Sequence, residues 1–163
     1  MAKDKYPLGA LLNVRHYREK NAQRDVSLAK IAVKQAKELI IQAEEELKEY
    51  QVWLLAEEER LYAEILGHEC YLDDIDEVKA KIAHLKLKEF QYEDNIVKAK
   101  QNLVLKEKEL EDARLRYANA QKDTLKITTH QEIWIEEVNR EEMLKEDLEA
   151  EEFKVKLINE YED

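Results

Sequence analysis

The sequence predicts an all-α fold, a long two-helix antiparallel coiled-coil hairpin. Its 163 residues include two glycines and one proline, too few turn residues for the hairpins of a multi-stranded sheet. Ala, Glu, Lys, Leu and Arg fill 92 positions, a composition typical of long helices. Two stretches with heptad-spaced apolar residues are separated by one break, which indicates two helices that fold back on each other.

The first helix is expected over about 8–66. Pro7 suits a first helical turn, and Gly67 can end the helix in the left-handed conformation. Between them, apolar residues recur at alternating steps of four and three, with alanine at every seventh position. This first seam consists of Ala22, Val26, Ala29, Val33, Ala36, Ile40, Ala43, Leu47, Tyr50 and Leu54. Small residues in a seam allow two helix axes to approach closely.

A connector is expected over about 67–83, with a short helical piece that Asp73 or Asp74 can cap. The second helix is expected over about 84–160. Its seam consists of Tyr92, Ile96, Ala99, Leu103, Lys106, Leu110, Ala113, Tyr117, Ala120, Thr124, Ile127, Gln131, Trp134 and Val138. After Glu141 the spacing slips, and it then resumes through Leu144, Leu148, Val155 and Ile158.

Matching small residues across the two seams predicts how they pair. Facing residues then have numbers that add to about 150, which places Ala36 opposite Ala113 and Arg15 opposite Trp134, within reach of a cation–π contact. A slip of one heptad remains open. Residues after about 149 are expected to lack a facing partner and to form an acidic helical tail.

Charge and composition exclude several classes of function. Residues 1–37 carry nine basic and three acidic residues, and residues 132–163 carry four basic and thirteen acidic ones. These blocks attract each other in a hairpin, or are simply two solvated helix faces. The net charge of −11 argues against nucleic acid as a partner, and no apolar run is long enough to insert in a membrane. The single cysteine and the absence of a secretory signal favour a soluble cytoplasmic protein.

Neither a catalytic nor a cofactor site is expected. Gly9 and Gly67 stand too far apart for a phosphate-binding loop. His68 and Cys70 form an H-x-C pair without a second pair of ligands, so no metal site is expected there. A two-helix hairpin also lacks a deep cavity for a substrate. Enzyme functions are therefore not favoured.

The opening segment resembles the start of the YscO and FliJ family of type III secretion proteins, and it is closer to the YscO branch. The similar residues are Tyr6-Pro7-Leu8-Gly9-Ala10-Leu11-Leu12-Asn13-Val14-Arg15-His16-Tyr17-Arg18-Glu19, followed by Ala22. Members of this family begin with an aromatic-Pro-Leu or similar, then a Leu-Leu-x-hydrophobic-Arg stretch and a long heptad helix. The chain length, the negative charge, the central break and the acidic C-terminal segment agree with the family.

The resemblance implies a hairpin similar to the central γ stalk of rotary ATPases. It implies that the paired termini engage the hexameric type III export ATPase, that the other end contacts the export gate protein, and that export chaperones bind. The residues implied for ATPase binding are Leu8, Leu11, Leu12, Arg15, Arg18, Trp134 and Val138. Those implied for the export gate at the tip are Leu72, Ile75, Ala80 and His84.

Together these observations favour a non-enzymatic central stalk and adaptor at the cytoplasmic face of a type III secretion apparatus. It is expected to be monomeric, because its seams face each other within one chain. The alternative is a peripheral-stalk or tethering coiled coil that dimerises through the same seams. A chaperone-like holder of exported proteins would need an exposed apolar groove, which narrow seams do not supply.

Overall fold

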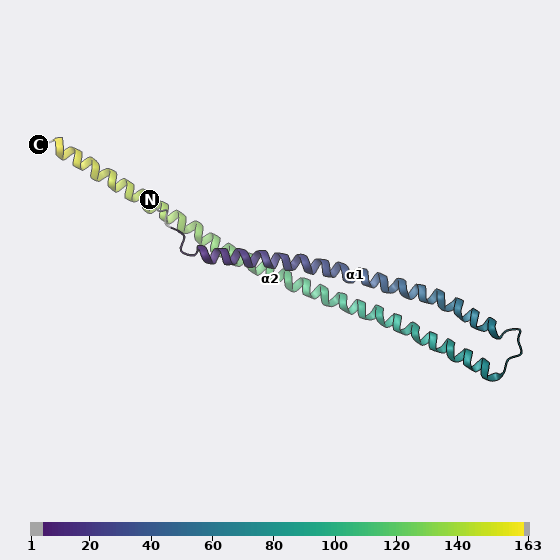
Figure 1. Cartoon of the computed structure of the whole chain (residues 1–163). Helices are drawn as coiled ribbons and strands as arrows, with labels where there is room; N and C mark the ends of the chain where they lie inside the picture. The colour runs from purple at the N-terminus through teal and green to yellow at the C-terminus, as the bar shows by residue number, and fades with distance from the viewer. Residues whose placement is uncertain (1–4, 162–163) are drawn as a thin grey trace. The chain divides into compact units, whose positions relative to one another are not determined.

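The protein consists of two long helices joined by a short loop (Figure 1). The computed structural model describes residues 5–161, and the side chains of residues 5–158. Helix α1 spans Gly9–Ile65 and helix α2 spans Leu72–Tyr161, and no strand occurs in this part of the chain. The two helices pack against each other, which confirms the prediction of an all-α helical hairpin.

Helix α1 begins and ends close to the predicted positions. Pro7 lies in the turn just before the helix, where the amide of Gly9 donates a hydrogen bond to the carbonyl of Tyr6 at 3.1 Å. After the last helical residue, Gly67 has a φ of 89°. This left-handed conformation costs glycine little because it has no Cβ atom, so the expected helix end at Gly67 is confirmed.

Helix α2 begins at Leu72, so the expected connector over 67–83 is wrong. The Asp74 carboxylate accepts a hydrogen bond from the backbone amide of Tyr71 at 3.0 Å, the reciprocal half of a capping box. Both Asp73 and Asp74 stand in the first turn, where negative charge is favourable. Val78 and Ile82 then pack on Leu61 of α1, and Ile75 is half-buried at the same spacing, so the second seam extends back towards the loop.

Contacts along the helix pair divide the chain into two compact units. The terminal unit contains the residues up to Arg24 and those from Arg114 onward, and the loop-side unit contains Asp25–Ala113. Each unit therefore contains a stretch of α1 and a stretch of α2. The expectation of a single domain stays a prediction.

The loop-side unit contains the apolar core. Leu61 packs against Val78 and Ile82, with Ile65 and Leu85 at the edge of this cluster. Every residue of the predicted first seam and of the predicted second seam is buried or half-buried. The buried hydrophobic residues are Val33, Ala36, Tyr50, Leu54, Leu61, Val78, Ile82 and Ala113. The heptad spacing therefore identified the packed faces of both helices.

The pairing of the seams differs from the prediction by one heptad. In the loop-side unit the ring of Tyr50 stacks on that of Tyr92 at a centroid distance of 4.6 Å. Beside them the Lys86 ammonium lies 2.9 Å from the Glu58 carboxylate. Such facing residues have numbers that add to about 143 instead of about 150, so Ala36 does not face Ala113.

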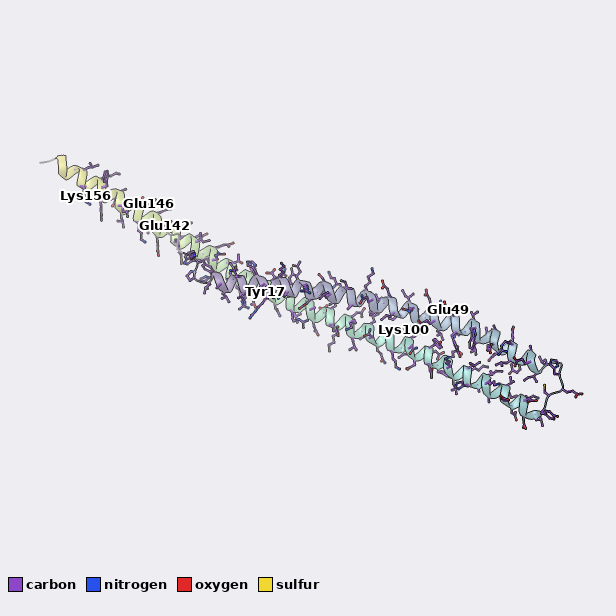
Figure 2. The ribbon with its side chains drawn as sticks, in the orientation of Figure 1. Tyr17, Glu49, Lys100, Glu142, Glu146 and Lys156 are labelled. Carbon is purple, nitrogen blue, oxygen red and sulfur yellow. The ribbon has the colours of Figure 1, made fainter. Side chains whose placement is uncertain are left out.

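The terminal unit has a more polar interface. Thr124 is its one buried residue among the described side chains, and its hydroxyl donates to the carbonyl of Ala120 at 3.0 Å. Past Val138, every described side chain of α2 is exposed, including those of Leu144 and Leu148. The unpaired tail thus begins about ten residues before the predicted position. Figure 2 labels Glu142, Glu146 and Lys156 on this stretch.

Candidate protein-binding site

The residues that the resemblance implied for partner binding lie in the terminal unit and near the loop. No group of His, Cys, Asp and Glu residues suited to a metal ion occurs in the part of the chain that the structure describes. Over the same residues, neither helix is apolar enough over a sufficient length to cross a membrane.

An aromatic cluster holds the start of the chain against α2. The Tyr6 hydroxyl lies 2.7 Å from Nδ1 of His130, and the ring of Tyr6 lies 5.4 Å from that of Trp134 at an angle of 58°. Tilted rings at this distance attract each other through their quadrupoles. These contacts place the Pro7 turn beside α2, just before α1 begins.

Next to this cluster, a shallow groove contains two residues of the predicted ATPase-binding set. It is lined by Lys5, Pro7, Trp134, Glu137, Val138 and Glu141. Trp134 and Val138 form its half-buried apolar part, whereas Glu137 and Glu141 add negative charge. The groove thus combines an apolar floor with a charged rim, as protein interfaces do.

The apolar residues at the start of α1 are less completely covered. Leu8 is 37% exposed and Leu11 is 36% exposed, while Leu12 is half-buried. Val14 and Tyr17 are also exposed. The first turns of α1 therefore offer apolar area that the contact with α2 leaves accessible.

A cleft of about 210 Å³ between the helices contains three arginines. It is lined by Arg15, Arg18, Arg116, Asn119, Ala120 and Asp123. The Arg15 guanidinium donates through one terminal nitrogen to the Asp123 carboxylate at 3.0 Å. Lys126 approaches the other oxygen of the same carboxylate at 3.9 Å. We call this set of residues the arginine cleft.

This geometry corrects the predicted contact between Arg15 and Trp134. In the terminal unit Arg15 contacts Asp123, which lies eleven residues before Trp134 on α2, and Trp134 contacts Tyr6 instead. The earlier matching of small residues could not find these partners. The signal that could have found Asp123 is its charge, since it is the single acidic residue in the predicted seam region between Arg114 and His130.

The residues implied for the export gate surround the loop. Leu72 is 80% exposed, and Ala80 and His84 are also exposed, one turn apart on α2. Ile75 is half-buried because it continues the seam. Within the loop, Cys70 lies with its sulfur 3.4 Å from the carbonyl of Ile65. Three of these four residues are therefore accessible to a partner.

Two solved structures have the same fold as this chain. One is a putative YscO homolog, CT670 from Chlamydia trachomatis, with 24% identity and a TM-score of 0.75 over 98% of both chains. The other is the type III secretion protein YscO from Vibrio parahaemolyticus, with 25% identity and a TM-score of 0.81 over 90% of this chain and 92% of that one. No curated protein sequence matches the chain.

The family model for the type III secretion protein YscO matches residues 8–156. This match covers almost the whole chain and includes, from Leu8 onward, the opening segment that carried the resemblance. The matched region also contains all of α1 and α2 as far as Lys156, which includes most of the acidic tail. The protein therefore belongs to the YscO family of type III secretion proteins.

Proposed function

We propose that the protein is a non-enzymatic central stalk and adaptor of a type III secretion export apparatus, acting as a monomer at its cytoplasmic face. In this proposal the terminal unit engages the hexameric export ATPase. The residues near the loop contact the export gate protein. Family membership and the antiparallel pairing of two long helices support this role.

The observation that carries the proposal is the unpaired tail of α2 beside the incompletely covered start of α1. Leu144, Leu148, Val155 and Ile158 lie on one face of the tail at helical spacing, and all are exposed. An amphipathic helix without a facing helix is suited to bind in the groove of another protein. The arginines at positions 15 and 18 and the groove at Trp134 and Val138 belong to the same unit.

The loop-side unit supplies surfaces for the other proposed partners. The exposed residues Leu72, Ala80 and His84 support contact of the loop region with the export gate. Farther along α2, Phe90, Val97 and Val104 are exposed and spaced by seven residues, so they share one outward face. Such a stripe supports the binding of export chaperones.

The tethering alternative requires the seams to pair between two chains. In this structure the seam residues of α1 already pack on those of α2 within one chain. The two functions differ in stoichiometry. A monomer in analytical ultracentrifugation supports the stalk, whereas a dimer whose seams can be cross-linked between chains supports the tether.

The orientation is tested with aspartate substitutions at exposed leucines. Leu8→Asp combined with Leu11→Asp removes apolar area from the terminal unit, whereas Leu66→Asp combined with Leu72→Asp makes the same change at the loop. We expect the terminal pair to weaken binding to the purified export ATPase by at least about tenfold, because each substitution exposes a charge where an apolar contact forms. The loop pair should bind the ATPase as the unmodified protein does.

Circular dichroism of both variants provides the control for folding, since all four positions are exposed. If the loop variant loses ATPase binding and the terminal variant keeps it, the proposed orientation is reversed. If the unmodified protein does not bind the ATPase, the stalk function itself is wrong.

A further inference from the structure

We infer that the arginine cleft receives carboxylate side chains from an acidic segment of the export ATPase, and that Arg116 is a contact residue of that interface. The inference rests on the proposed function and names the chemistry of its recognition. It also adds Arg116 and Asn119 of α2 to the site, beside Arg15 and Arg18 of α1.

The charges inside the cleft are unbalanced. Three guanidinium groups line it, and Asp123 is the one carboxylate among its lining residues. Asp123 already binds Arg15 and lies near Lys126. Within the described part of the chain, Arg18 and Arg116 have no carboxylate partner within ion-pair distance. The cleft therefore has a positive surplus that an incoming acidic group would neutralise.

The Arg15 side chain is largely withdrawn from water. It is only 29% exposed, and its Nε atom has no hydrogen-bond partner among the described residues. An acceptor that reaches its guanidinium is therefore screened less by water than at an open surface.

The shape and charge of the molecule favour carboxylates over a polyphosphate or nucleic acid. The helical stretches 8–24 and 114–130 of this unit carry eight basic residues and two acidic ones. The stretch 131–158 that follows carries ten acidic residues and four basic ones, and it would repel an extended polyanion. A small cleft between two helices admits single side chains, and a planar arginine fork matches a carboxylate.

The test removes two charges from the cleft and compares the result with removing two charges elsewhere in the same unit. The test variant is Arg18→Gln combined with Arg116→Gln. The control is Lys20→Gln combined with Lys122→Gln, since both lysines are exposed and lie outside the cleft. Binding of each full-length variant to the purified export ATPase is measured from low to physiological salt.

We expect the test variant to bind about tenfold more weakly than the control, in line with lost hydrogen bonds to charged groups, and to respond less to salt. We also expect Asp123→Asn to bind the ATPase more tightly, because it removes the carboxylate that competes with the incoming one. Weaker binding of this variant would contradict the assignment of the cleft as a carboxylate-binding site.

The outcomes separate this inference from the proposed function. If the unmodified protein binds the ATPase and the test variant binds like the control, the inference is wrong while the stalk function stands. Tight binding of inorganic pyrophosphate that the test variant loses would make the cleft a phosphate site and overturn the assignment. Self-association that the test variant loses would overturn it in favour of the acidic tail of a second copy.

Discussion

Tyr50 connects the two helices of the loop-side unit through both its ring and its hydroxyl. The ring stacks on Tyr92 of α2 and touches Trp53 of its own helix. The hydroxyl donates to the backbone carbonyl of Leu85 at 2.8 Å. Burial, together with the negative charges that Tyr92 and Glu89 bring nearby, raises the pKa of Tyr50 above its ordinary value. The other residues of the first seam are aliphatic and pack without a preferred direction. At Tyr50 the hydrogen bond to Leu85 therefore fixes the position of α1 against α2.

Tyr50→Phe should lower the free energy of unfolding by about 1 kcal/mol, because the hydroxyl and its hydrogen bond are lost while the ring remains. The matched control is Tyr62→Phe on the same helix, where the side chain is exposed and little change is expected. Urea unfolding followed by circular dichroism measures both. An equal effect of the two substitutions would contradict the role of the Leu85 contact.

The same pair of variants has a pH dependence with a defined sign. Because the folded state disfavours the ionised phenol, the Tyr50 contribution to stability is complete below about pH 10 and is lost as the pH rises through the raised pKa. The unmodified protein and the Tyr62→Phe control should therefore lose stability above about pH 10 more steeply than Tyr50→Phe. Parallel curves for Tyr50→Phe and the unmodified protein would show that Tyr50 does not contribute.

At the scale of the helices, the sequence predicted the packed faces but not their pairing. Heptad spacing determines which side of a helix is apolar, and it is unchanged when one helix slips by seven residues. The flanking charges contain the missing information. The true pairing sets Glu58 beside Lys86 and Glu44 beside Lys100, whereas the predicted one would set Glu58 near Glu93 and Glu44 near Glu107. Like charges at these positions disfavour the wrong pairing.

Because the pairing of the helices could not be predicted, some residues of the candidate site were also missed. Exposed residues such as Leu8, Leu11 and Leu72 followed from the resemblance, and their accessibility agrees with a surface role. Arg116 and Asp123 joined the site only through the pairing of the helices, so the wrong pairing hid them. The early start of α2 was missed because the second seam was followed back only to Tyr92, although Val78, Ile82 and Leu85 continue it towards the cap at Asp74.

The pairing can be tested with the native residues. A zero-length carbodiimide reagent joins carboxylates to ammonium groups that are already in contact, so it should link Glu58 to Lys86 within one chain. A weaker link is expected between Glu44 and Lys100, whose atoms are 3.8 Å apart. Mass spectrometry of the digested monomer identifies both. Links that correspond to a pairing one heptad away would contradict the structure.

Across the whole molecule, the burial of apolar side chains is unequal. All eight buried hydrophobic residues among the described side chains belong to the loop-side unit. The terminal unit contains one buried residue, Thr124, and is held by the Tyr6 cluster and the contact between Arg15 and Asp123. Burial of apolar area is the main stabilising contribution in folding. The unit proposed to bind the ATPase is therefore expected to be the less stable part of the hairpin.

Hydrogen exchange followed by mass spectrometry tests this difference within a single helix. Amides of α1 from Arg15 to Arg24 should exchange faster than those from Tyr50 to Leu61, although both segments are helical, because exchange follows local opening and the second segment packs on the buried cluster. The α2 tail from Asn139 to Ile158 should exchange fastest, since nothing covers it among the described residues. Uniform protection along α1 would contradict the expected difference in stability between the two units.

The same measurement with the export ATPase added tests where the ATPase binds. A decrease in exchange confined to the terminal unit would show that binding supplies the packing that this unit lacks. Protection confined to the loop-side unit would instead place the ATPase at that unit.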